Sequence, residues 1–348
     1  MTTENLSRLQ DLEVRLYKLT TRSHLRVGAG EGTADVATEN PIIRALILEQ
    51  NGAEKRVPYI PGSSMHGVVR AWVEKVLRSG QSPLSRDELE TRLGEMEQSN
   101  QKNLRDMVKR EVAEFLGIGV ETVTEENLFE HWRVYTNPHV CDPLSDVDKC
   151  ERITIQEGQP IPWKANWWQV IGRQPPCEVC RIFGYMGQRG RVKFSHAWPT
   201  TDQPPLDVIT RVAINRLTGA ADEGKLFDLE AIPPGVSFHF FVVMENMNGD
   251  KEKFDLGFKA LSLQFAGLGA HSTVGFGMVD VGQVFRVQID PKIFHRDVEA
   301  EFIEPMLQQG TATLADFDQD KFPRFFRALV VAHASSQSPL PDLIRFVK

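Results

Sequence analysis

The sequence has few of the features that mark membrane and secreted proteins. Its longest apolar run, around residues 238–244, is far shorter than the roughly 20 residues of a membrane-spanning helix. The opening stretch, MTTENLSRLQDLEVRL, has no basic segment followed by an apolar one and does not look like a secretory signal. We therefore expect a cytoplasmic protein with no membrane partner.

Nucleotide-binding signatures are also missing. The glycine-rich turns GAGEG (28–32) and GLGAHSTVGFG (267–277) match neither a P-loop nor a G-x-G-x-x-G that enters a helix. Taken singly, each is best explained as a tight turn with positive φ. Together with a capped helix start and interspersed Arg22, His24 and Arg26, they favour a surface that a nucleic-acid backbone approaches closely.

Positive charge is scarce overall but unevenly distributed. The net charge of -7 argues weakly against a nucleic-acid partner. However, residues 86–130 contain six Lys/Arg and twelve Asp/Glu, a balance of -6, so the acidic excess is local. Residues 181–194 contain four basic and no acidic side chains. The sequence therefore allows a local basic surface, and the acidic segment fits a neighbouring subunit with a basic face.

The apolar periodicity predicts an α+β fold, with a helical insertion at 84–130. Strands are predicted at 12–27, 42–48, 236–244 and 279–289, and helices at 65–79, 253–265 and around 322–331. The order of these elements fits an RNA-recognition-motif or ferredoxin-like core with inserts.

The segment YIPGSSMHGVVR (59–70) predicts a helix start. Ser63 and Ser64 precede the helical spacing of Met65, Val69 and Val73, so the serine pair is predicted as the helix N-cap. A capped helix start with free backbone N–H groups is also a site for a phosphate, although a plain cap explains the serines as well.

The four cysteines lie within 40 residues, spaced Cys141-x8-Cys150-x26-Cys177-x2-Cys180. The Cys-x2-Cys half is typical of tetrahedral zinc, so we predict a structural Zn²⁺ site, with His139 as an alternative ligand to Cys141. Four sulfur ligands leave no open position for catalysis. Disulfides and thioredoxin-like redox chemistry are the alternatives, and the expected compartment and the sequence context favour neither.

Four segments, in order, resemble motifs of the RAMP superfamily, the repeat-associated RNA-binding proteins of CRISPR systems. YIPGSSMHGVVR is similar to its Ile-Pro-Gly-Ser-Ser-x-x-Gly-x-x-Arg segment, and CEVCRIFG (177–184) resembles its Cys-x-x-Cys-x-Leu-Phe-Gly. Residues 211–238 look like its thumb segment, and LGAHSTVGFGMV (268–279) resembles its C-terminal glycine-rich loop. The subgroup that the chain most resembles is the backbone subunit of type III effector complexes.

The resemblance implies a single core domain over 10–300 with a modified RNA-recognition-motif fold. An acidic helical insertion (80–135), a zinc-binding segment (136–182) and a thumb hairpin (211–235) would interrupt it, and 301–348 would be a C-terminal extension. The implied partners are CRISPR guide RNA, complementary target RNA and other subunits of the effector complex. The implied RNA-binding residues are Arg22, His24, Arg26, Ser63, Ser64, His66, Arg70, Arg211, Arg216, His271 and Ser272.

The resemblance also implies a Mg²⁺-dependent endoribonuclease acting on target RNA. The loop that carries the family's catalytic aspartate here reads TENPIIR (38–44), so Glu39 stands at the aspartate position, with Asp35 four residues earlier. Glutamate reaches one methylene further, and a displacement of about 1 Å can cost about 10²-fold in rate. Solvation in an exposed loop explains both carboxylates equally well. In that case the chain would be a non-cleaving structural subunit.

Two further alternatives stay open at this point. A guide-processing ribonuclease of the same superfamily would need no metal and would use His24 or His271 as general acid or base. A zinc-stabilised protein-interaction module would lack bound small RNA altogether.

Overall fold

The structure, a computed structural model, describes sixteen stretches of the chain. These are residues 9–28, 41–48, 52–79, 87, 109–110, 112–114, 116–124, 126–127, 177–185, 188–201, 203–214, 217, 220–247, 249–310, 313–335 and 343–347. Among the helices in these stretches, none is long and apolar enough to cross a membrane.

The chain divides into two compact units. The smaller one comprises Met1–Leu6 and Val73–Arg191, and the larger one Ser7–Trp72 and Val192–Lys348. Helix α1 (Gly62–Ser79) begins in the larger unit. The described elements of the smaller unit include η1 (Val120–Thr122), α6 (Glu178–Phe183), β4 (Gly184–Tyr185) and β5 (Gln188–Arg189).

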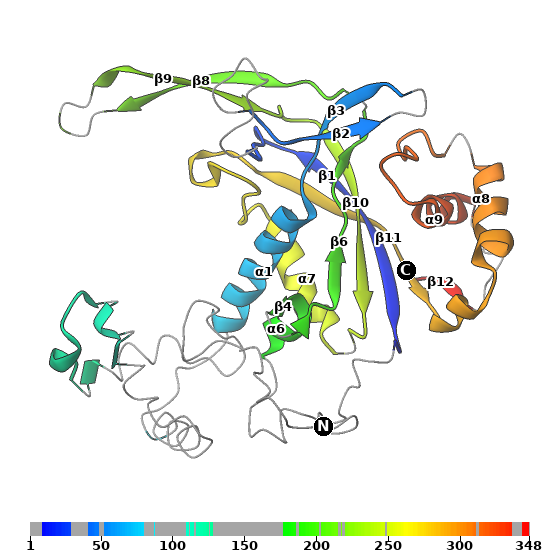
Figure 1. Cartoon of the computed structure of the whole chain (residues 1–348), viewed down its shortest axis with the longest axis horizontal. Helices are drawn as coiled ribbons and strands as arrows, with labels where there is room; N and C mark the ends of the chain where they lie inside the picture. The colour runs from blue at the N-terminus through cyan, green and yellow to red at the C-terminus, as the bar shows by residue number, and fades with distance from the viewer. Residues whose placement is uncertain are drawn as a thin grey trace. The chain divides into compact units, whose positions relative to one another are not determined.

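An antiparallel sheet forms the centre of the larger unit (Figure 1). Its strand order is β12 (Ile344–Val347), β11 (Val279–Ile289), β1 (Leu12–Thr21), β10 (Ser237–Glu245) and β6 (Val192–Phe194), and β7 (Trp198–Pro199) also pairs with β10. The predicted mixed α/β class and the strands at 236–244 and 279–289 are therefore confirmed.

The predicted strand at 12–27 is wrong beyond Thr21. The backbone N–H groups of Arg22 and Ser23 donate to the carbonyl of Met278, at 2.8 and 3.3 Å, instead of continuing a ladder. The chain therefore leaves the sheet and runs beside the glycine-rich turn. Polarity alternates in the same way on both sides of this point, so periodicity alone could not locate the strand end.

Two helices cover one face of this sheet. The strands β1, β6, β10 and β11 and these two helices follow one another along the chain in the order β1, α1, β6, β10, α7 (Lys251–Ser262) and β11, with other elements inserted between them. Tyr17 of β1 stacks on Phe258 of α7 with ring centroids 4.5 Å apart. A Cβ on Gly257 of α7 would lie 2.6 Å from the carbonyl oxygen of Val69, so α7 crosses closely over α1. This order and layering are compatible with the predicted ferredoxin-like core.

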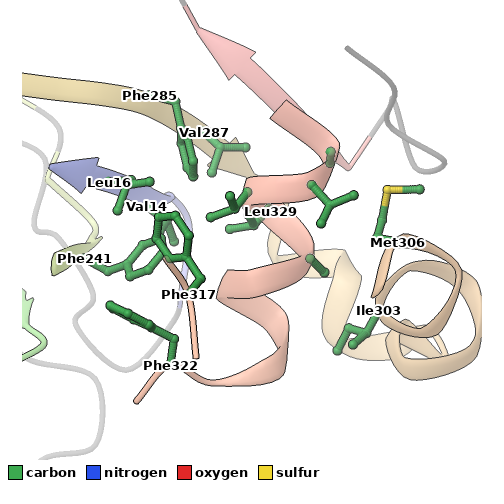
Figure 2. Packing of buried hydrophobic residues seen from close by; sticks show 14 of the residues in the cluster. Val14, Leu16, Phe241, Phe285, Val287, Ile303, Met306, Phe317, Phe322 and Leu329 are labelled. Carbon is green, nitrogen blue, oxygen red and sulfur yellow. The ribbon is translucent and has the colours of Figure 1, made fainter. Parts of the chain in front are cut away.

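The described residues between 291 and 335 cover the other face; they overlap the predicted extension at 301–348 and are called the C-terminal extension from here on. They form η3 (Pro291–His295), the π-helix η4 (Glu299–Ile303), α8 (Glu304–Gln309) and α9 (Arg324–Ser335). Figure 2 shows Val14, Leu16, Phe241 and Phe285 of the sheet facing side chains of this extension. Phe241 stacks on Phe326 with centroids 4.4 Å apart. This apolar core buries the face of the sheet that α1 and α7 leave open.

Within the described residues of the larger unit, two hairpins lie outside the central sheet. They are β2 (Arg44–Leu48) with β3 (Glu54–Pro58), and β8 (Asp207–Ile214) with β9 (Ala221–Ala231). The carboxylate of Glu230, which is buried, accepts the N–H of Ile42 at 3.0 Å and pairs with Arg44. Leu25 and Ile232 exchange two backbone hydrogen bonds of 2.8 Å. These contacts anchor the base of the β8–β9 hairpin to β2 and to the segment that follows β1.

Candidate nucleic-acid interface

The glycine-rich loop between α7 and β11 lies against residues 22–28. Ala270 donates its N–H to the carbonyl of Arg26, and Gly277 donates to that of His24, both at 2.8 Å. Gly277 has a φ of +74°, and a Cβ there would overlap the carbonyl oxygen of Leu268. Glycine is therefore required where the loop closes on itself, and the close approach fixes the loop beside the end of β1.

Three of the predicted RNA-binding residues, His24, Arg211 and His271, gather around the ring of Phe276. His24 and His271 each lie with ring centroids 5.8 Å from Phe276. The guanidinium carbon of Arg211, from β8, lies 4.5 Å from the Phe276 centroid. Three segments that are distant in sequence thus bring cationic and titratable groups to one place, as a site for phosphates requires.

Two carboxylates that the sequence analysis did not single out balance part of this charge. Asp207 Oδ2 lies 2.9 Å from His24 Nε2, and Asp280 Oδ2 lies 2.6 Å from Arg22 Nη2. The side chains of Arg22 and Asp280 are both about half exposed, so this pair contributes little to stability. An RNA phosphate would compete with Asp280 for Arg22 and with Asp207 for the ring nitrogen of His24.

Arg26 and His271 lie in a partly desolvated part of the loop. Burial lowers the pKa of His271, and the charges of Arg26 and Arg211 lower it further, so the ring is neutral at neutral pH. Burial also lowers the pKa of Arg26, whose Nε is buried without a hydrogen-bond partner. His271 has a φ of 62° at the start of the 3-10 turn η2 (Ser272–Val274), where Ser272 is exposed.

The prediction that Ser63 and Ser64 form the N-cap of α1 is wrong. The helix begins at Gly62, because the carbonyl of Pro61 already accepts the N–H groups of Ser64 and Met65 at 3.0 and 3.4 Å. Both serines therefore lie inside the first turn, and His196 Nδ1 instead accepts the Gly62 N–H at 3.1 Å.

Gly62 is needed because the helix starts directly on the backbone of β6. A Cβ there would lie 2.5 Å from the carbonyl oxygen of Phe194. The ring of His66, one turn further along α1, meets Phe194 edge-on at 5.7 Å. The predicted group of Ser63, Ser64, His66 and Arg70 thus lies on the first turns of α1, on a different element from the group around Phe276.

Cys177 and Cys180 share the first turn of α6. Cys177 is the N-cap of this helix, and its Sγ accepts the N–H of Cys180 at 3.4 Å. Both sulfurs therefore belong to one turn at a helix N-terminus, where the helix dipole favours thiolates and metal binding. Their predicted partners Cys141 and Cys150 lie outside the described residues, as do Asp35, Glu39 and Arg216.

Comparison with known proteins identifies the family. The family model described as RAMPs: RAMP superfamily matches residues 18–280. The chain belongs to the RAMP superfamily. In this RAMP protein the matched range begins within β1 and ends at the start of β11, so it contains α1, the β8–β9 hairpin and the glycine-rich loop. It leaves out the whole C-terminal extension.

No curated protein matches the chain. Among solved structures, the RAMP protein is similar to a chain of "Cryo-EM structure of the Type III-B Cmr-beta bound to cognate target RNA". The sequence identity is 15% and the TM-score is 0.36, and the match covers 78% of this chain and 59% of that chain.

Proposed function

We propose that this RAMP protein is a backbone subunit of a type III CRISPR ribonucleoprotein effector, which binds guide RNA and shapes the guide–target duplex. The observation that carries the proposal is the convergence of His24, Arg211 and His271 on Phe276, at a loop whose glycines permit close backbone approach. Family membership favours RNA as the ligand. Guide RNA, target RNA and the other effector subunits are the proposed partners.

RNA binding is tested by a matched pair of substitutions. Arg22 and Arg324 form equivalent ion pairs: the N···O distances to Asp280 and Glu299 are both 2.6 Å, and the arginines are 56% and 58% exposed. Arg22→Gln should weaken the binding of labelled single-stranded RNA and reduce the salt dependence by about 0.7 in log–log slope, the value for one lost phosphate contact. Arg324→Gln, in α9, should change neither. Wild-type protein that binds no RNA would overturn the proposed function.

We propose further that the effector cuts target RNA with Mg²⁺ held by Glu39 or Asp35. The metal would offset charge that develops on the phosphate, and the 2′-hydroxyl of RNA would supply the nucleophile. The test uses the assembled, guide-loaded complex with labelled complementary RNA, in Mg²⁺ or in EDTA. If a Mg²⁺-dependent product disappears only in Glu39→Ala or only in Asp35→Ala, the substituted residue is identified as the carboxylate required for cleavage. Unchanged cleavage in both variants would make this chain a non-cleaving scaffold.

Cys177 and Cys180 are proposed as two ligands of a structural Zn²⁺ ion, together with Cys141 and Cys150. The N–H donated to Cys177 Sγ is the kind of bond that stabilises a coordinated thiolate. Metal analysis of purified protein should find one equivalent of zinc, which Cys177→Ser and Cys180→Ser should each reduce. If both variants kept the zinc content of the wild-type protein, the assignment would be refuted.

A further inference from the structure

Phe276 is a buried ring within an exposed loop. Residues 272–275 and Met278 are exposed, whereas Phe276 is only 6% exposed. Among the described residues, the rings of His24 and His271 and the guanidinium of Arg211 lie against the Phe276 ring. This buried ring thus contacts groups that can bind a phosphate, whereas the ring of Phe241 contacts other phenylalanines of the core.

Arg211 differs from Arg22 in how its guanidinium is held. Arg22 is paired with a carboxylate, but within the described part of the chain Arg211 joins no ion pair and its guanidinium donates no hydrogen bond. The guanidinium carbon instead lies over the Phe276 ring, 4.5 Å from its centroid. A guanidinium stacked by its face keeps all five N–H donors at its edge, in the plane that matches a phosphate.

We infer that Phe276 is a positioning residue, which holds the Arg211 guanidinium by stacking so that its free edge binds an RNA phosphate. The inference rests on the proposed function, because the ligand is the RNA backbone. Phe276 would then contribute to the binding free energy although it does not contact the RNA. The reason is that a guanidinium held against the ring loses less rotamer freedom on binding than a free one.

The test compares three variants by anisotropy of a labelled single-stranded RNA over a series of KCl concentrations. Phe276→Leu keeps an apolar side chain but removes the π face, and it should weaken binding about five- to tenfold and lower the salt slope by about 0.7. Phe276→Tyr keeps the π face and should bind as wild type does. Phe322→Leu makes the same change at a buried site of the C-terminal extension and should leave affinity and salt slope unchanged.

A double-mutant cycle with Arg211→Gln shows whether Phe276 acts through Arg211. If it does, Phe276→Leu has little further effect in the Arg211→Gln background, and the two losses are far from additive. Additive losses, an unchanged salt slope in Phe276→Leu, or failure of Phe276→Tyr to restore binding would each overturn the inference. Wild-type protein without RNA affinity would instead overturn the proposed function, so the two failures are distinguishable.

Discussion

Both faces of the central sheet are covered by apolar side chains, but only the face towards α7 also buries charge. Towards α7, β1 presents Glu13 and Arg15, which pair with each other at 2.6 Å and with Lys251 and Asp255 of the helix. Towards the C-terminal extension, β1 and its neighbours present the apolar cluster shown in Figure 2. The family match includes the helices of the first face and stops before those of the second.

This difference bears on where the proposed RNA ligand could bind. Because the extension buries Phe241, Phe285 and Val287, none of these side chains can stack on a base. The loops at the end of β1, with the glycine-rich loop and the base of the β8–β9 hairpin, remain as the proposed binding surface. The extension therefore separates the folding core of the larger unit from its proposed ligand site.

The largest expected effect comes from opening the apolar face. Phe241→Ala removes a fully buried ring that contacts Phe285, Phe317, Phe322 and Phe326, and it should lower the free energy of unfolding by about 3–5 kcal/mol. Chemical denaturation measures the loss. The exposed Phe294→Ala is the control and should stay near wild type. An equal, small effect of both would show that the extension does not pack on the sheet.

Disrupting the buried ion pairs on the face towards α7 should lower the free energy of unfolding by somewhat less. Arg15→Met leaves Glu13 buried with Lys251 as its remaining cation, and should destabilise by about 3 kcal/mol. The double variant Glu13→Leu/Arg15→Met removes both charges and should regain part of this loss. Arg324→Met, which breaks an exposed pair, should change stability by less than about 0.5 kcal/mol. A double variant less stable than Arg15→Met would contradict this reading.

The apolar face should also make stability depend on pH. Burial of His239 under Phe317, at a centroid distance of 4.6 Å, lowers its pKa from 6.5 to about 4. The nearby Asp316 partly opposes this shift, whereas Lys18 adds to it. Between these pH values the unfolded chain binds the proton and the folded protein does not. Stability is therefore fully present above pH 6.5 and is lost as the pH falls towards 4, by about 3 kcal/mol.

His239→Phe isolates this contribution. The variant keeps a ring against Phe317 without a titrating group, so the difference in unfolding free energy between it and wild type should grow as the pH falls from 6.5 to 4. The exposed His295→Gln is the matched control, and its pH profile should follow that of wild type. A pH-independent difference between His239→Phe and wild type would refute the assignment.

The smallest effect is expected for the Arg22–Asp280 ion pair at the proposed RNA site. Asp280→Asn frees Arg22 from its carboxylate and should tighten RNA binding about twofold, while it changes stability by less than about 0.5 kcal/mol. Glu299→Gln, the same change at the equivalent pair in the extension, should leave RNA affinity unchanged. Tighter binding in both variants would indicate a general effect of net charge.

Sequence reasoning predicted those elements whose burial leaves a clear apolar pattern, which is a nearly continuous run in β10 and a periodic pattern in β11 and the helices. The strands β10 and β11 and the helices α7 and α9 fall close to their predicted positions for this reason. The β8–β9 hairpin gave only weak periodicity, because Val208, Val212 and Leu226 are exposed despite being apolar. Its position came from the resemblance alone.

The residues missed at the site are those whose role depends on partners distant in the chain. His196 accepts the first N–H of α1, 134 residues away, and no local pattern could assign it this role. Phe276 reads as part of a glycine-rich turn, and only the fold brings Arg211 and His24 to its ring. Asp207 and Asp280 have no distinguishing sequence signal, because only the fold brings them to His24 and Arg22.

The position of β1 in the sheet has a consequence for the order of folding. β1 ends at Thr21, and its two neighbours, β10 and β11, begin only at Ser237 and Val279. During synthesis the strand leaves the ribosome long before either partner exists, and the smaller unit is made in between. Pairings this distant in sequence carry a large loop-closure cost and slow the folding rate. The first of the described strands to be synthesised is thus among the last to find its partners, and until then its apolar residues are exposed to aggregation.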